Sequence, residues 1–116
     1  PDGVPNIILP PRSRTLVPTG LILGIPQGYC VLVFPRSGIS LKQGITSNNA
    51  VGVIDSDYVE ELFVSVYNNS SVRVSIGHGD RIAQFMLQKV EDFAVVETQM
   101  RPVSETRQGG FGSTGG

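Results

Sequence analysis

The amino-acid sequence predicts an all-β fold, built as an antiparallel β-sandwich or β-barrel. Valine and isoleucine are abundant and alanine is rare, which favours strands over helices. Glycine (14 residues) and proline (8 residues) supply the turns. Short runs with apolar or alternating side chains recur about every 8–12 residues, with turn residues between them, as in antiparallel sheets.

Apolar patterning places six strands along the chain. They are residues 15–17, 29–34, 61–67, 71–76, 81–90 and 93–98. Residues 29–34 (YCVLVF) are almost continuously apolar, as in a strand that is buried on both faces. Residues 61–67 and 71–76 alternate apolar and polar side chains, as in strands with one buried face. The predicted turns are Pro18-Thr19-Gly20, Asn68-Asn69-Ser70 and Gly77-His78-Gly79-Asp80. No stretch carries both the start and the stop signals of a helix.

The chain is expected to divide into a β domain, residues 1–100, and a flexible C-terminal segment, residues 101–116. A length of 116 residues corresponds to one domain. Strand-forming residues nearly vanish in the C-terminal segment, and its last ten residues (RQGGFGSTGG) hold too many glycines to pack in a core. A segment that is only flexible needs no charged, aromatic or hydroxyl side chains, but this one contains Arg107, Phe111, Ser113 and Thr114.

The charge balance and the cysteine content exclude several classes of function. Charged residues make up only 16% of the chain, against ~25% in typical soluble proteins, which suggests that other copies of the chain cover part of the surface. The net charge of −1 argues against general nucleic-acid binding and against a polybasic membrane contact. No apolar run approaches the ~18 residues of a membrane span. The lone Cys30 forms no internal disulfide and, with His78 as the only histidine, builds no His/Cys metal site. We therefore expect a cytoplasmic location, with a nuclear or viral one as the alternatives.

Three polar clusters interrupt the strands, and each carries groups suited to a phosphorylated ligand. Residues 35–38 (PRSG) offer a guanidinium, a hydroxyl and backbone N–H groups, which are the parts of a phosphate-binding turn. Residues 47–58 (SNNAVGVIDSDY) place Asp55 after an apolar stretch, where a carboxylate is rigid and partly desolvated, as suits a general base. Asn49 offers a donor and an acceptor, as the edge of a nucleobase requires. The third cluster is residues 79–84 (GDRIAQ), and each cluster alone also fits an ordinary turn.

Taken in order, these clusters resemble the trimeric dUTPase family. The matching motifs are PRSG at 35–38, NNAVGVIDSDY at 48–58, GDRIAQ at 79–84 and RQGGFGSTG at 107–115, with LVPTG at 16–20 ahead of them. The resemblance implies a jelly-roll β fold and a homotrimer in which each active site is shared by the three chains. It also implies hydrolysis of dUTP to dUMP and pyrophosphate, which would keep uracil out of DNA.

The resemblance implies roles for the residues that would contact the nucleoside. Asp55 resembles the general base that deprotonates the water attacking the α-phosphorus. Tyr58 resembles the aromatic residue that packs under the deoxyribose and leaves no room for a 2′-hydroxyl. Asn49, Val53 and Phe63 resemble the hairpin that reads uracil.

Other matching residues resemble the contacts to the phosphates and the closing lid. Arg36, Ser37 and Gly38 resemble the phosphate-binding turn, and Gln84 resembles the residue beside the α-phosphate and the water shell of the metal. In the C-terminal segment, the residues that resemble the γ-phosphate clamp, the ring on uracil and the lid's phosphate contacts are Arg107, Phe111, Gly112, Ser113 and Thr114. The implied Mg²⁺ ion is bound through the substrate's phosphates and water, without protein ligands.

Two departures from the family pattern leave alternatives open. The family's opening Ala-Gly-(aromatic)-Asp-Leu motif does not occur in the sequence, so the first strand of the β domain is expected to be missing. Val59-Glu60 also stands where the family commonly has Arg-Gly. One alternative is a regulatory or binding module on a dUTPase scaffold with weak or no catalysis. The other is a related dCTP deaminase-type activity.

Overall fold

The computed structural model describes residues 4–103, and within them the chain forms eight strands and one short helix. The strands are β1 (Ile7–Leu9), β2 (Arg14–Ile22), β3 (Tyr29–Pro35), β4 (Ile45–Ser47), β5 (Gly52–Asp55), β6 (Glu61–Asn68), β7 (Val74–Ile76) and β8 (Ala83–Lys89). The helix is α1 (Ser37–Gln43). The all-β class predicted from the sequence is confirmed.

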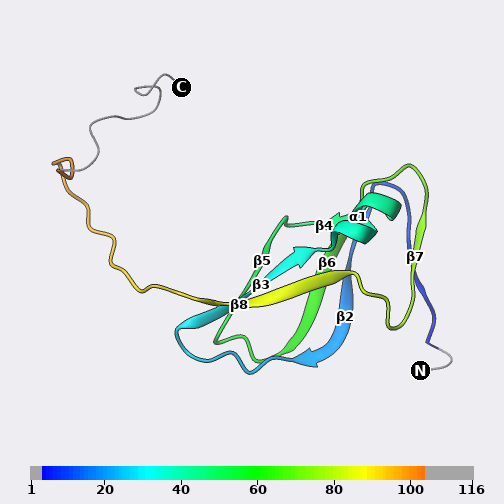
Figure 1. Ribbon diagram of the computed structural model, residues 1–116, viewed down its shortest axis with the longest axis horizontal. Helices are drawn as coiled ribbons and strands as arrows, with labels where there is room; N and C mark the ends of the chain where they lie inside the picture. The colour runs from blue at the N-terminus through cyan, green and yellow to red at the C-terminus, as the bar shows by residue number, and fades with distance from the viewer. Residues whose placement is uncertain (1–3, 104–116) are drawn as a thin grey trace, which may run out of the picture.

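The strands pair antiparallel in three small sheets (Figure 1). Their orders are β1-β7, β2-β6-β4 and β5-β3-β8. β3 is hydrogen-bonded on both edges, with Cys30 opposite Asp55 of β5 and opposite Gln88 of β8. Val31 and Val33 are buried on one face of β3, whereas on the other face Cys30 is buried and Leu32 and Phe34 are half-buried, so the burial on both faces that the sequence predicts is only partial in a single chain.

The structure corrects three local predictions. Pro18-Thr19-Gly20 is not a turn, because it lies inside β2 where the register with β6 shifts. Residues 71–73 belong to no strand, since only residues 74–76 pair with β1. Residues 93–98 also form no strand, because no other segment within residues 4–103 lies beside them to accept and donate backbone hydrogen bonds.

Helix α1 was not expected from the sequence. Arg36 is its N-cap in an extended conformation, and Gly44 ends the helix with φ of 72°, in the left-handed region that favours glycine. Ile39 packs against the hydrophobic core. Seven residues are too few to display a helical repeat of apolar side chains, so only the glycine signalled the helix end. Within the described part of the chain, no helix is long and apolar enough to cross a membrane.

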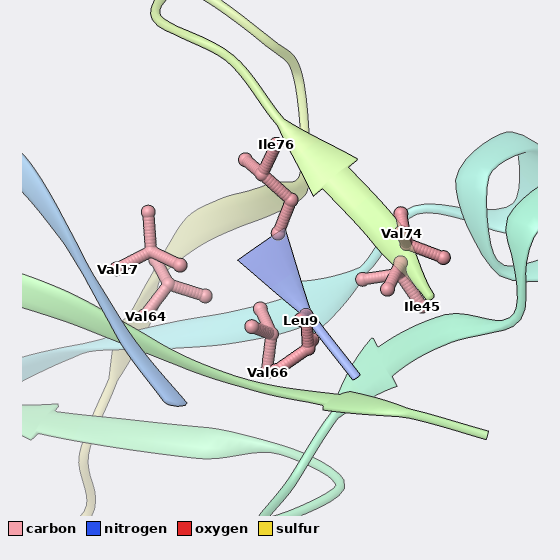
Figure 2. Packing of buried hydrophobic residues seen from close by; sticks show 7 residues of the cluster. All are labelled: Leu9, Val17, Ile45, Val64, Val66, Val74 and Ile76. Atoms are coloured by element: carbon pink, nitrogen blue, oxygen red, sulfur yellow. The ribbon is translucent and has the colours of Figure 1, made fainter. Parts of the chain in front are cut away.

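The hydrophobic core is formed by aliphatic side chains from five strands. They are Leu9, Val17, Ile45, Val64, Val66, Val74 and Ile76. Figure 2 shows these side chains converging from the β1-β7 sheet and the β2-β6-β4 sheet. No residue of β5 belongs to this cluster, so β5 stands apart from the core and its residues are available to a site.

Asn68, the last residue of β6, is fully buried and joins three segments of the chain. Its Nδ2 donates to the carbonyl oxygens of Leu9 (3.0 Å), Pro10 (3.2 Å) and Val72 (2.8 Å). Its Oδ1 accepts from the backbone N–H of Ser70 (3.0 Å) and from the Ser70 hydroxyl (2.7 Å). A buried amide that satisfies so many groups is costly to remove, because each group left unpaired costs about 1–3 kcal/mol.

We expect Asn68→Leu to lower the free energy of unfolding by about 3 kcal/mol or more, since leucine has a similar volume but leaves buried carbonyl oxygens unpaired. Urea denaturation measures this loss. Asn69→Leu is the control, because Asn69 is exposed and its side chain accepts one hydrogen bond from Arg12, at 2.9 Å. Equal losses in the two variants would contradict the structural role of Asn68.

Candidate active site

Asp55 and Tyr58 are the two ends of one turn after β5. Asp55 is the last residue of β5 and pairs with Cys30 of β3. The backbone N–H of Tyr58 donates to the carbonyl oxygen of Asp55 at 3.1 Å. The strand pairing and this hydrogen bond hold the two residues at a fixed spacing. Asp55 is exposed, so a single chain does not provide the partial desolvation that the sequence led us to expect.

A pocket of about 460 Å³ lies against this turn. Its lining residues are Val53, Ile54, Asp55, Asp57, Tyr58, Leu62 and Phe63. The structure therefore brings together four residues singled out in the sequence, Asp55, Tyr58, Val53 and Phe63. A carboxylate at the rim of a hollow with apolar and aromatic walls suits a ligand with a flat base and a polar tail.

A smaller pocket of about 210 Å³ adjoins the first, because Val53, Ile54 and Phe63 line both. Asn49, the predicted base-reading residue, lines this second pocket. The two pockets thus place a side-chain amide at one end and the Asp55–Tyr58 turn at the other. Such an arrangement matches a nucleoside, whose base and sugar follow one another.

The loop that carries Asn49, between β4 and β5, is closely held, but it is not a hairpin, because the two strands belong to different sheets. Its backbone hydrogen bonds run from Asn48 N–H to Ser65 O (3.0 Å), from Ala50 N–H to Ser47 O (3.3 Å) and from Val51 N–H to Asn49 O (2.7 Å). Ala50 has φ of 61°, a left-handed conformation that costs energy outside glycine. At Gly52 an added Cβ would lie 3.3 Å from Asn49 Nδ2, so the glycine lets the amide approach the strand.

Asp55 also lines a hollow of about 450 Å³ with a strongly acidic wall. Asp57, Glu91 and Asp92 share this hollow with it. Among residues 4–103, no group of three or more His, Cys, Asp or Glu side chains is arranged to hold a metal ion. Because like charges repel, the residues around Asp55 do not by themselves hold a chain of phosphates.

A second cluster of site residues, Arg36, Ser37, Gly38 and Gln84, lies at the end of β3 opposite to Asp55. Arg36 is half-buried directly after β3, and Ser37 and Gly38 are exposed in the first turn of α1. Gln84 of β8 joins them, since its Nε2 donates to the carbonyl oxygen of Pro35 at 3.2 Å. The structure therefore groups all four residues that the sequence assigned to phosphate contacts in the β domain.

The two clusters are too far apart within one chain to act on the same phosphate. Asp55 pairs with Cys30 at the start of β3, whereas Gln84 pairs with Phe34 near its end. At roughly 3.3 Å per residue, the run from Cys30 to Pro35 spans roughly 16 Å. A general base and the groups that bind the attacked phosphate lie within a few ångströms of the reacting atoms. The roles that the resemblance implies for the two clusters can therefore be met together only by clusters of different chains.

Some site residues lie outside the described residues, and others were not singled out in the sequence. Arg107, Phe111, Gly112, Ser113 and Thr114 all lie outside the described range. Asp57, the second carboxylate of the 47–58 cluster, lines two of the hollows around Asp55 although the sequence motifs assign it no role. Glu61 was not singled out, because it begins the alternating run 61–67, which predicts only an ordinary strand.

The sequence matches a family model described as dUTPase over residues 4–115. The deoxyuridine 5′-triphosphate nucleotidohydrolase of Finegoldia magna is 46% identical over 110 residues, which cover 95% of this chain and 77% of the relative. That of Caulobacter vibrioides is 43% identical over 115 residues, which cover 99% of this chain and 74% of the relative. The similarity includes the C-terminal segment as well as the β domain.

Solved structures agree with these matches. The dUTPase from Streptococcus mutans superimposes with a TM-score of 0.74 at 26% identity, over 78% of this chain and 76% of that one. A mutant dUTPase from phage phi11 of S. aureus, described with a structural Mg(II) ion, gives a TM-score of 0.78 over 85% of this chain and 80% of that one. Its 20% identity shows a shared fold alone.

The fold class predicted from the sequence, an all-β jelly roll, is confirmed by these structures. Since the family model covers nearly the whole sequence and relatives exceed 40% identity, the chain belongs to the dUTPase family.

Proposed function

We propose that this chain hydrolyses dUTP to dUMP and pyrophosphate. The observation that carries the proposal is the turn that holds Asp55 and Tyr58 together beside a pocket shared with Val53 and Phe63. Membership of the dUTPase family supports the same conclusion. Neither alternative, a binding module without catalysis or a dCTP deaminase, gains support from the described residues or from the relatives.

The β4–β5 loop reads the base. Uracil enters the pair of pockets with its edge toward Asn49 and the backbone beside Val53, and the ring packs against Phe63. Because backbone hydrogen bonds hold this loop, it does not widen for the methyl group of thymine. Cytosine presents a donor where uracil presents an acceptor, so the same backbone groups reject it.

Asp55 acts as the general base. It takes a proton from a water molecule whose oxygen attacks the α-phosphorus, and the bond to the bridging oxygen of the β-phosphate breaks, so that pyrophosphate leaves with the electron pair. Tyr58 packs under the deoxyribose and fixes the sugar relative to this carboxylate. Since attack must be in line with the leaving group, positioning supplies a large part of the rate.

Arg36, Ser37, Gly38 and Gln84 of a second chain bind the phosphates, because in one chain they stand at the far end of β3 from Asp55. Residues 101–116 act as a lid, in which Arg107 contacts the γ-phosphate, Phe111 stacks on uracil, and the remaining phosphate contacts come from Gly112, Ser113 and Thr114. A lid that excludes water strengthens these charged contacts and opens for product release.

A homotrimer is the assembly that brings these parts together. Its support in the single chain is the large apolar surface left uncovered at β8, where Phe85, Met86 and Leu87 are each more than half exposed although they alternate between two faces. The apolar surface continues past β8 with Phe93 and Val95, in the segment that leaves the body of the molecule (Figure 1). An uncovered apolar strand is a contact surface for another chain.

We propose that Mg²⁺ binds to the phosphates of the substrate and that Gln84 lies near the water shell of the ion. The carboxylates around Asp55 form no cluster that holds an ion, whereas a triphosphate offers the hard oxygen ligands that Mg²⁺ prefers. When bound, the ion offsets negative charge on the phosphates. We propose a cytoplasmic location, which fits the buried, free thiol of Cys30.

Pyrophosphate release tests the proposed function. We expect hydrolysis of dUTP with Mg²⁺ present and at least about 100-fold lower kcat/KM for dTTP, dCTP and UTP, since the base or the sugar of each does not match the β4–β5 loop or the sugar pocket. Chelation of Mg²⁺ should lower the rate on dUTP. Ammonia release from dCTP would favour the deaminase alternative, and equal rates on all four nucleotides would contradict the proposal.

A further inference from the structure

The start of β6 lies where its pairing with β2 is interrupted. The pairs on either side of the interruption are Pro18–Phe63 and Ile22–Glu61. Residues 19–21 of β2 therefore face Leu62 alone, and Gly20 has φ of 73° within this irregular stretch. The backbone ladder alone does not fix the beginning of β6 here, so other contacts must do so.

Two side chains supply those contacts. The Thr19 hydroxyl donates to the carbonyl oxygen of Leu62 at 2.7 Å and accepts from the backbone N–H of Leu21 at 3.1 Å. The Glu61 carboxylate accepts from the backbone N–H of Gly20 at 3.0 Å. The bonds to Leu62 and to Glu61 join β2 to β6 across the interruption, and the one to the carboxylate is charge-assisted. Glu61 is therefore fastened to the irregular stretch of β2 through its side chain.

The same residue holds Tyr58 through its backbone. The Tyr58 hydroxyl donates to the carbonyl oxygen of Glu61, while the Tyr58 backbone N–H donates to Asp55. The ring is thus held at both ends, by the turn on one side and by Glu61 on the other. Tyr58 is 37% exposed and lines the pocket next to Asp55, so packing alone does not fix the ring.

We propose that Glu61 is a positioning residue for Tyr58 and thereby sets the discrimination between deoxyribose and ribose. The proposal rests on the function proposed above and adds the element that makes the sugar pocket rigid. Selection against a 2′-hydroxyl requires a ring that cannot retreat by the width of one oxygen atom. The Gly20–Glu61–Tyr58 connection transmits the rigidity of the sheet to that ring.

Four variants test this connection. Glu61→Ala removes the carboxylate, and Glu61→Gln keeps an oxygen that accepts from Gly20. Tyr58→Phe removes the hydroxyl and keeps the ring, and Glu60→Gln changes an adjacent exposed carboxylate. We expect the ratio of kcat/KM for dUTP over UTP to fall about tenfold in Glu61→Ala and in Tyr58→Phe, in line with loss of one charge-assisted or constrained hydrogen bond. Glu61→Gln and Glu60→Gln should retain the ratio of the unmodified protein.

The pattern of the ratios separates positioning from general damage. The double variant Glu61→Ala/Tyr58→Phe should lose no more selectivity than either single variant, because both break the same connection. An unchanged ratio in Glu61→Ala, or a loss in Glu61→Gln as large as in Glu61→Ala, would overturn the proposal. A lower kcat/KM on both nucleotides with the ratio unchanged would also overturn it, since that is the signature of a merely structural role.

A second measurement does not depend on turnover. The chain has 3 tyrosines, so incorporation of 3-fluorotyrosine gives few ¹⁹F resonances, and Tyr58→Phe identifies the one from Tyr58. This resonance should shift or narrow in Glu61→Ala as the ring gains freedom, and stay unchanged in Glu60→Gln. If the unmodified protein does not hydrolyse dUTP, the proposed function is wrong. In that case an unchanged resonance still overturns the positioning of Tyr58 by Glu61.

Discussion

Asp55→Asn should reduce kcat for dUTP hydrolysis by about 10³-fold while nucleotide affinity stays within about twofold, because a positioned general base contributes on the order of 10²–10⁴ to a rate. Asparagine has nearly the same shape as aspartate but cannot take the proton from the attacking water. Asp55 is fixed by its strand pairing with Cys30, so the amide occupies the same position. Pyrophosphate release gives kcat, and titration calorimetry with a non-hydrolysable analogue of dUTP gives the affinity of both proteins.

Asp57→Asn is the matched control for this prediction. Asp57 belongs to the same turn and lines the same two hollows as Asp55, but it follows the end of β5 and is not paired with β3. We expect its loss of kcat to stay below about tenfold, since removal of a nearby charge acts only through the local potential. Equal losses in the two variants would mean that the acidity of the hollow, and not a base at position 55, carries the reaction.

Apolar patterning predicted the long strands of this fold because burial imposes it directly. β3 is covered at least in part on both faces and β6 on one, and their side chains follow those two patterns. The sequence predicts a turn at the irregular stretch around Thr19 and Gly20, because a proline and a glycine favour both a turn and a bulge. The choice between them depends on the partner strand and on the side chain of Glu61, 41 positions further along the chain.

The residues of the candidate site were predicted individually, whereas the sharing of one site between chains was expected from the family resemblance alone. Sequence motifs give the chemistry of Asp55 and of Arg36, and a motif contains no information on which strand end lies near which. The pairing of β3 with both β5 and β8 places the two groups at opposite ends of one strand. Residues 93–98 show a second reason why a prediction from the sequence fails. Their apolar pattern predicts a strand, but residues 4–103 contain no strand that pairs with them.

The separation of Asp55 and Arg36 leads to the second prediction, which concerns mixed oligomers. If a complete site takes Asp55 from one chain and Arg36 from another, Asp55→Asn and Arg36→Ala each leave every site in their own homotrimer defective. In an oligomer that contains both variants, some sites combine the intact Asp55 of one chain with the intact Arg36 of its neighbour. With random mixing in equal amounts, about a quarter of the sites are complete in a symmetric assembly.

We therefore expect the two inactive variants, unfolded together and refolded as a mixture, to recover about a quarter of the activity of the unmodified protein. The control mixture is Asp55→Asn with Tyr58→Ala. These two residues lie in one turn of one chain, so every site in that mixture still contains one of the defects. Recovery in the first mixture alone requires a shared site. Absence of recovery in both mixtures would mean that the roughly 16 Å along β3 is bridged within one chain, which would require β3 to separate from β5 or β8 during the reaction.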